Sequence, residues 1–270
     1  EWDENNNVTA KRLNDLFYIM NREQFEEEML KRLTENTDSF TLTDTEQMLL
    51  DIEDQKIHRY IHSKSRQIVQ TFIDDYCVGI VHAEQYLSEL GNALNNLYPH
   101  MDMIVLLNMS GKKMGFRTIH DEVNVSEFAK KYGGGGHPKA SGSELTSYAF
   151  NQFFVNVFEN TPLKPDADRN EYNLKNSQIG TSYQNNLGEI SYIIPTGNGG
   201  FNVVHNKKKL DQSFKTFADA ERHLKRNYSA WMRSDHEFLY QLSKALRISQ
   251  DEIKGNYQEI VSNHLIDSIE

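Results

Sequence analysis

Apolar residues recur every three or four positions through the first quarter of the chain. Two short helices are predicted within residues 8–33, and a longer helix is predicted over 43–73. Thr43 followed by Glu46 matches the capping-box pattern, which marks the start of the longer helix. The beginning of the chain is therefore expected to be mainly helical.

The pattern then changes to short apolar runs that alternate with helical segments. Runs bounded by polar residues predict strands, because they are too short for buried helices. The predicted strands are 77–81, 103–107 and 114–119, and the predicted helices are 86–97, 125–132 and 149–158. A turn at 110–113 joins two of the strands as a hairpin. This alternation predicts an α/β domain with a mixed sheet.

A polar stretch with two prolines and several asparagines, residues 160–180, predicts a linker. Beyond it, residues 188–206 predict a hairpin and residues 216–268 predict three helices. The expected fold class is α/β. It comprises a helical N-terminal segment with a long connecting helix, a central α/β domain with a mixed sheet, and a small α+β C-terminal module. The expected boundaries of these parts are 1–42, 43–74, 75–160 and 180–270.

Composition and charge narrow the class of protein. The chain has 270 residues and a net charge of −10, which argues against a surface built for duplex DNA or an anionic membrane. No apolar run approaches the roughly 20 residues that a membrane helix needs. The single cysteine, Cys77, excludes an internal disulfide and favours a reducing compartment. We therefore expect a cytoplasmic protein without a membrane partner.

One window of the sequence is basic. Residues 207–233 carry eight Lys or Arg against three Asp or Glu, and aromatic residues lie between the basic ones. Single-stranded nucleic acid is bound in this way, because charge follows its backbone and rings stack on its bases. The alternative is a solvated hairpin and an amphipathic helix whose aromatic side chains face their own core. The candidate RNA-binding residues are Lys207, Lys208, Lys209 and Arg226.

The least usual segment is 133–142, GGGGHPKASG. Consecutive glycines cost backbone entropy, and a fold tolerates them where the backbone must approach something closely. Their successive N–H groups can form an anion-binding nest, and His137 can donate to a phosphate oxygen. Lys139 adds a positive charge, Ser141 adds a hydroxyl, and Arg117 on a preceding strand suits a bidentate phosphate contact. The composition alone leaves a flexible loop as the alternative, and Arg117 alone would more often be a salt-bridge partner.

The segment and its surroundings resemble the C-terminal, substrate-binding domain of the DHH phosphoesterase superfamily. A strand (CVGIVHAE), a helix (YLSELGNAL) and a second strand (MDMIVLLNM) come first. A strand that ends in arginine (MGFRT), a short helix (VNVSEFAKKY) and the glycine–histidine loop follow in the same order. The similarity covers residues 75–145. The superfamily includes RecJ-like exonucleases, nano-RNases and cyclic-dinucleotide phosphodiesterases.

The resemblance implies a two-metal phosphodiesterase whose N-terminal domain holds two manganese ions and whose C-terminal domain grips the substrate. It is closest to the bacterial nano-RNase B branch, which implies hydrolysis of short single-stranded RNA to mononucleotides, in the 3′-to-5′ direction. The alternatives are a cyclic-dinucleotide or adenosine 3′,5′-bisphosphate phosphoesterase, and a non-catalytic module that binds phosphate or nucleic acid. The substrate-binding residues that carry over are Gly134, Gly135, Gly136, His137 and Arg117, and more weakly Ser88 and Asn92.

The sequence departs from the superfamily pattern at one point. It contains no Asp-His-His triplet and no strand ending in paired aspartates before residue 75. Residues 1–42 resemble the last helices of the metal domain, and 43–74 resemble its connecting helix. We therefore expect this chain to be the C-terminal part of a longer protein, with no catalytic residue or metal ligand of its own. On this interpretation it binds the substrate without hydrolysing it, and a homodimer is a further expectation of the resemblance.

Overall fold

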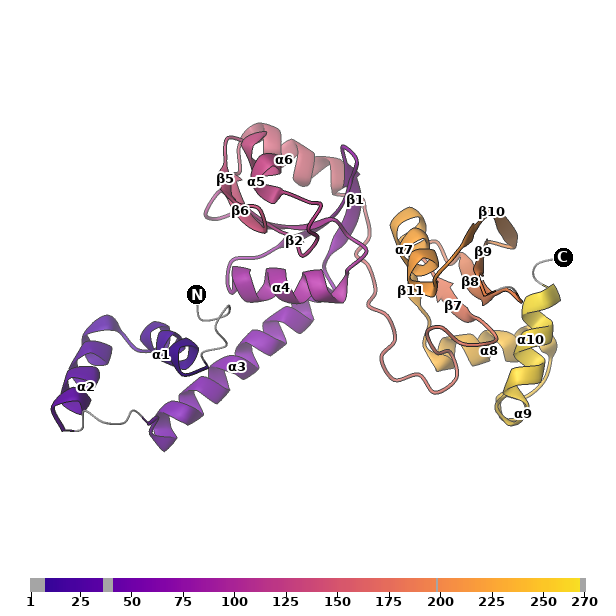
Figure 1. The fold of residues 1–270 in the computed structure, drawn as a ribbon, viewed down its shortest axis with the longest axis horizontal. Helices are drawn as coiled ribbons and strands as arrows, with labels where there is room; N and C mark the ends of the chain where they lie inside the picture. The colour runs from indigo at the N-terminus through magenta and orange to yellow at the C-terminus, as the bar shows by residue number, and fades with distance from the viewer. Residues whose placement is uncertain (1–7, 36–40, 198, 268–270) are drawn as a thin grey trace. The chain divides into compact units, whose positions relative to one another are not determined.

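The computed structural model describes residues 8–35, 41–197 and 199–267. It divides into two compact units, residues 1–63 and residues 64–270, which are described separately. The second unit contains two sheets, one of six strands and one of five (Figure 1). The expected α/β class with a mixed sheet is confirmed.

The first unit is helical. It contains α1 (Val8–Ile19), α2 (Arg22–Glu35) and most of α3 (Asp44–Ser65), so the two helices predicted within 8–33 are confirmed. The capping box is present at the start of α3: the Thr43 N–H donates to the Glu46 carboxylate at 2.8 Å, and the Glu46 N–H donates to the Thr43 hydroxyl at 3.2 Å. Arg32 of α2 also contacts the Glu46 carboxylate, at 2.6 Å. This contact ties α2 to the start of α3.

The long helix predicted over 43–73 is wrong beyond Ser65. Residues 69–73 form strand β1 (Val69–Ile73), which pairs antiparallel with β2 (Tyr76–His82). Asp74, with a φ of 52°, lies in the turn between these strands. The sequence VQTFI is rich in β-branched and aromatic residues, which favour a strand. Its apolar spacing, taken together with that of α3, resembled the continuation of a helix.

The six-stranded sheet has the order β1-β2-β3-β4-β6-β5. Its other strands are β3 (Met103–Asn108), β4 (Lys113–Arg117), β5 (Gly135–His137) and β6 (Ala140–Glu144). Only the pairing of β2 with β3 is parallel. Helix α4 (Leu87–Leu97) lies on one side of this sheet, and α5 (Val125–Lys130) and α6 (Ser147–Phe153) lie on the other (Figure 1). The aromatic helix predicted over 149–158 continues after α6 only as a short 3-10 turn, Val155–Val157.

The second sheet is antiparallel and has the order β10-β9-β8-β7-β11. Its strands are β7 (Thr181–Gln184), β8 (Ile190–Pro195), β9 (Phe201–His205), β10 (Lys208–Phe214) and β11 (Trp231–Met232). The predicted hairpin is confirmed as β8 and β9. Helix α7 (Phe217–Tyr228) shares a core with one face of this sheet. Helices α8 (Asp235–Leu246), α9 (Gln250–Gly255) and α10 (Tyr257–Asp267) share a core with the other face.

Strand β10 was not predicted, because its sequence KKLDQSF carries few apolar residues. It is the edge strand of its sheet, and exposed lysines on an edge strand discourage pairing with another chain. The polar stretch 160–180 has no helix or strand, as predicted. It is nevertheless packed, since the buried Asn173 side chain donates to the carbonyls of Ser182 and Arg233.

Candidate functional site

The free end of the six-stranded sheet brings the glycine–histidine segment beside Arg117. Arg117 of β4 pairs with Ala140 of β6, which pairs with His137 of β5. Residues directly opposite each other on neighbouring strands point to the same face. The next row on this face, two residues along each strand, consists of Gly115, Gly142 and Gly135. We call these two rows, of three residues each, the glycine shelf.

Helix α4 covers the same face of the sheet but only as far as β4. Its Gly91 lies against Arg117, because a Cβ atom at Gly91 would stand 2.7 Å from Arg117 Cγ. Gly135 and His137, two strands further on, are exposed. The opposite face is the hydrophobic core beneath α5 and α6. The glycine shelf is therefore the uncovered strip of the sheet next to α4.

The four consecutive glycines have different roles. Gly133 ends α5 with a φ of +74°, and the N–H groups of Gly133 and Gly134 donate to the carbonyls of the preceding turn at 3.1 and 3.0 Å, as in a Schellman motif. A Cβ at Gly134 would lie 2.1 Å from the Gly142 carbonyl oxygen, and one at Gly136 would lie 2.8 Å from that of Ala140. A Cβ at Gly135 would meet nothing within 4 Å. The fold therefore requires glycine at positions 134 and 136. It does not require glycine at 135, where the missing side chain leaves open space on the glycine shelf.

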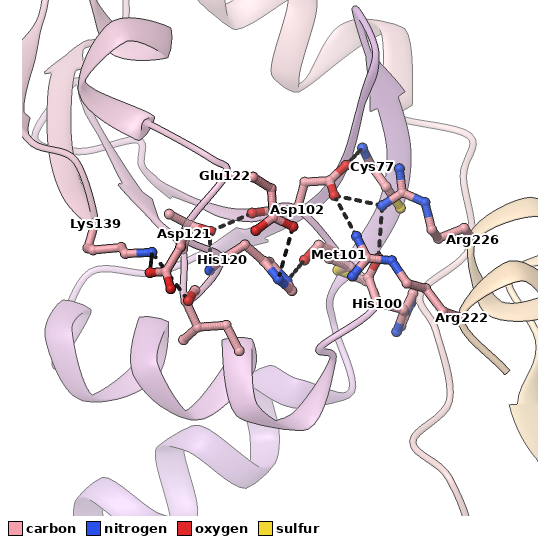
Figure 2. Close-up of polar contacts among 12 residues, drawn as sticks. Cys77, His100, Met101, Asp102, His120, Asp121, Glu122, Lys139, Arg222 and Arg226 are labelled. Atoms are coloured by element: carbon pink, nitrogen blue, oxygen red, sulfur yellow. Dashed lines mark hydrogen bonds and ion pairs between the residues drawn. The ribbon is translucent and has the colours of Figure 1, made fainter. Parts of the chain in front are cut away.

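The segment is not the anion-binding nest that its sequence suggested. Two of its N–H groups close the end of α5, and Gly135–His137 form the edge strand β5. Lys139 is also occupied, since its ammonium group donates to the Asp121 carboxylate at 2.8 Å (Figure 2). The Ser141 hydroxyl faces the opposite side of the sheet and donates to the Val125 carbonyl at 2.6 Å. Neither Lys139 nor Ser141 contributes to the glycine shelf.

Arg117 is a half-buried cation without an anionic partner. Its Nη1 donates to the Phe116 carbonyl at 3.0 Å and, more weakly, to the Ser141 carbonyl at 3.4 Å. No Asp or Glu among the described residues forms an ion pair with it. Burial lowers the pKa of the guanidinium below its ordinary value. A desolvated cation with no counter-ion is unfavourable, so an anion on the glycine shelf would stabilise this arrangement.

Ser88 and Asn92 are exposed on α4. Ser88 lies one turn before Gly91, the residue that contacts Arg117, and one turn before Asn92. Their place near the substrate stays a prediction.

Two glycines of the shelf, Gly115 and Gly142, were not among the predicted site residues. The signal that marks them is a period of two: Gly115 precedes Arg117, and Gly142 follows Ala140, by two residues. Residues two apart on a strand share a face. Of the three strands that carry the glycine shelf, only β4 is predicted from the sequence. Without a predicted strand over 140–144, the spacing of Ala140 and Gly142 did not indicate a shared face.

The basic window divides into exposed and engaged residues. Lys207, Lys208 and Lys209 are exposed on the β9–β10 turn and on β10. Arg226 is different: its Nη1 lies 2.7 Å from the Asp102 carboxylate and donates to the His100 carbonyl at 3.0 Å (Figure 2). The Arg226 side chain is 20% exposed and that of Asp102 is 9% exposed. Of the four predicted RNA-binding residues, only the three lysines present a free charge.

The aromatic residues of the basic window pack into the core of their own module. Phe214, Phe217 and Tyr228 belong to the core that α7 shares with the second sheet, and Trp231, outside that core, is also buried. The alternative interpretation, an amphipathic helix and hairpin with inward-facing rings, is therefore confirmed for these side chains. Base stacking by this window finds no support.

The expected manganese pair would need clustered His, Asp or Glu side chains as ligands. Within residues 8–35, 41–197 and 199–267, no three or more His, Cys, Asp or Glu side chains form a group that could hold a metal ion. The described residues do not fit a two-metal centre. In the same part of the chain, no helix is long and apolar enough to cross a membrane.

Among the solved structures that match part of this chain, two cover about half of it. One is the pGpG-specific phosphodiesterase PggH from Vibrio cholerae, 13% identical, over 49% of this chain and 48% of that one, with a TM-score of 0.31. The other is an exopolyphosphatase-related protein from Bacteroides fragilis, 12% identical, over 51% of this chain and 39% of that one, with a TM-score of 0.24. Scores this low carry no argument about fold or function.

Sequence comparison is more informative. Residues 180–252 match the model of the oligoribonuclease NrnB C-terminal domain. The chain is 44% identical to oligoribonuclease NrnB of Bacillus subtilis (strain 168) over 254 residues, which are 94% of this chain and 63% of that protein. This confirms the predicted resemblance to the bacterial oligoribonucleases of the DHH superfamily. The chain is thus similar to an oligoribonuclease along nearly its whole length but spans less than two thirds of that protein, and its residues 180–252 match the model of the NrnB C-terminal domain.

Proposed function

We propose that this chain grips the substrate of a phosphodiesterase that hydrolyses short RNA oligonucleotides to mononucleotides. The observation that carries the proposal is Arg117, a half-buried guanidinium that has no anionic partner among the residues the structure describes and that faces a strip of glycines. The printed name of the Bacillus subtilis relative, an oligoribonuclease, supports RNA as the substrate. Arg117 supplies the positive charge, and the glycines give the substrate room.

The glycine shelf suits a phosphodiester for two reasons. Arg117 and His137 stand on either side of Ala140, two strand spacings or about 10 Å apart at the backbone. A phosphate over Ala140 could accept hydrogen bonds from both side chains, and charge-assisted bonds of this kind are among the strong ones. Gly115, Gly142 and Gly135 present no side chain beside this row, so the sugar and the next phosphate can lie close to the sheet.

Hydrolysis needs a metal centre that the described residues do not provide. We propose that its ligands lie outside these residues and that the ions are manganese, as the superfamily resemblance implies. We likewise propose that cleavage runs from 3′ to 5′. On this proposal the chain binds RNA but does not cleave it, and added Mn²⁺ yields no mononucleotide above an EDTA control when the products are separated by chromatography.

The binding experiment uses fluorescence anisotropy with a labelled five-nucleotide RNA and the 270-residue chain. The variants are Arg117→Ala, His137→Ala and Gly135→Val. The Cβ that the last variant adds meets nothing within 4 Å in the chain. Gly255→Val is the matched control, because a Cβ at Gly255 also meets nothing within 4 Å and Gly255 lies on α9.

We expect each glycine-shelf variant to weaken RNA binding about tenfold or more, with unchanged thermal unfolding and an unchanged control. Wild-type affinity in all three variants would refute the proposal. Cyclic dinucleotide and adenosine 3′,5′-bisphosphate serve as competitors. Displacement of RNA by either one at lower concentration than unlabelled RNA would favour the corresponding alternative substrate.

A further inference from the structure

A second positively charged surface lies on the C-terminal module, between β10 and the start of α7. One cavity of about 500 Å³ is lined by Lys209, Lys215, Ser213 and Asn202, among others, and by no carboxylate. An adjoining cavity of about 420 Å³ extends from Lys215 to Arg222. The two cavities share Ser213, Phe214 and Lys215. They therefore adjoin at the end of β10, and we call the two together the β10 groove.

Two cations of the β10 groove, Lys209 and Lys215, are not neutralised within the described part of the chain, whereas Arg222 and Arg226 at its far end pair with Asp102. Lys209 and Lys215 are exposed and form no ion pair with any residue the structure describes. The one carboxylate that lines the groove, Asp219, accepts a hydrogen bond from the Thr216 hydroxyl at 2.7 Å at the start of α7. This concentration of unpaired positive charge stands out in a chain whose net charge is −10.

Protection of an edge strand explains only part of this charge. Exposed lysines on β10 would discourage pairing of its edge with another chain, which accounts for Lys208 and Lys209. Lys215 follows the end of β10 and contributes nothing to that protection. Edge protection also leaves the hollow shape of the surface unexplained.

The shape of the groove comes from an irregular pairing of β10 with β9. Lys209 pairs with Val204 and Ser213 with Asn202, so β10 spends two more residues than β9 on this stretch. Extra residues of this kind bend a strand and turn its side chains. Nearby, the groove is lined by the backbone of Gly199, where a Cβ would meet nothing within 4 Å. The larger cavity is therefore a hollow bordered by two lysines, two hydroxyls, the Asn202 amide and bare glycine backbone.

The chemistry of the groove favours phosphate over nucleobase. The phenylalanine that lines it, Phe214, is buried in the core of the module, and no exposed aromatic ring lines the groove. Lysines bind phosphates as point charges. The Ser213 hydroxyl donates to the Asn202 amide oxygen at 3.2 Å, which leaves the Asn202 amide nitrogen as a further donor. We propose that the β10 groove binds the phosphodiester backbone of an oligonucleotide, without base preference, beyond the part held on the glycine shelf. This inference rests on the proposed function.

The test compares short and long oligonucleotides. Anisotropy titrations use a labelled dinucleotide and a labelled heptanucleotide with the wild-type chain, Lys209→Glu/Lys215→Glu and Arg117→Ala. Lys244→Glu/Lys254→Glu is the matched control, since it changes the charge equally on α8 and α9 of the same module and neither residue lines the groove. Each titration is repeated at several salt concentrations and with a DNA heptanucleotide.

We expect Lys209→Glu/Lys215→Glu to weaken heptanucleotide binding about tenfold or more, for RNA and DNA alike, and to leave dinucleotide binding unchanged. The slope of log affinity against log salt should fall by roughly 1.4, because each phosphate contact with a single strand contributes about 0.7. If Lys209→Glu/Lys215→Glu binds the heptanucleotide as well as the control does, while Arg117→Ala binds neither the dinucleotide nor the heptanucleotide, the proposal for the β10 groove is wrong and the proposed function stands. A wild-type chain that binds neither ligand would overturn the proposed function as well.

Discussion

Two segments of this chain look equally suited to phosphate in the sequence, the glycine run at 133–136 and the basic window at 207–233, but the fold uses them differently. The glycine run keeps one residue, Gly135, that the fold itself does not require. The basic window contributes Arg226 and Lys225 to ion pairs with Asp102 and Asp166. A cluster of charges in a sequence does not show which charges are already neutralised, since the neutralising carboxylates lie more than 50 residues away.

The largest expected loss of stability comes from removing the carboxylate that pairs with the arginines of the basic window. The buried Asp102 carboxylate accepts from the Cys77 N–H at 2.7 Å and contacts Arg226 and Arg222 at 2.7 and 3.2 Å (Figure 2). Asp102→Ala removes the shared anion and should lower the free energy of unfolding by about 3–5 kcal/mol, measured by urea denaturation. Arg222→Ala is the control. Because the Arg222 side chain is 40% exposed, its loss should cost under about 1 kcal/mol.

The second effect concerns the pH dependence of the same region. Burial alone would raise the pKa of Asp166, but Lys225 and Lys175 outweigh it and lower this pKa from 3.8 to about 2. A pKa lowered in the folded state adds stability above the unfolded pKa, and this stability is lost as the pH falls from about 4 to about 2. The contribution is about 2 kcal/mol.

Urea denaturation between pH 2 and pH 6 measures this contribution. The stability difference between the wild type and Asp166→Asn should shrink as the pH falls through that window. Asp251→Asn provides the comparison, because the Asp251 side chain is 96% exposed. A wild-type-to-Asp166→Asn difference that stays constant across the window would contradict the assignment of an ion pair to Asp166.

The smallest expected change in stability distinguishes Gly136, which the fold requires, from Gly135, which it does not. Gly136 has a φ of +147°, and an added Cβ would lie 2.8 Å from the Ala140 carbonyl oxygen. Gly136→Ala should therefore lower the free energy of unfolding by about 1–3 kcal/mol. Gly135→Ala should change it by less than about 0.5 kcal/mol. Equal losses of stability in the two variants would show that the fold, rather than a ligand, requires Gly135.

Much of the fold could be predicted from local patterns. The capping box of Thr43 and the short apolar runs around β2 and β3 depend on neighbouring residues alone, and these elements are confirmed. Strands β1 and β10 were missed for opposite reasons. The apolar spacing of β1 continued that of α3, and β10 is so polar that only its pairing with β9 identifies it.

The candidate site could be predicted only in part. His137 and Arg117 were found from their residue types, but the register that places them in one row is a property of three strands from distant segments. Gly115 and Gly142 joined the site through the same register. Whether the Arg226 charge is free to bind RNA depends on Asp102, which neutralises it from 124 residues earlier in the chain. Such long-range pairings are decided by the whole fold and leave no trace in local spacing.

The position of β5 has a consequence for motion. It is a strand of three residues, two of them glycine, at the edge of its sheet, where it pairs with β6 alone. Edge strands this short open locally at a fraction of the global unfolding free energy. We expect the surface that holds Gly135 and His137 to open locally, and a bound oligonucleotide to hold it closed. Amide hydrogens of β5 are then the ones whose exchange with solvent slows most when the ligand arrives.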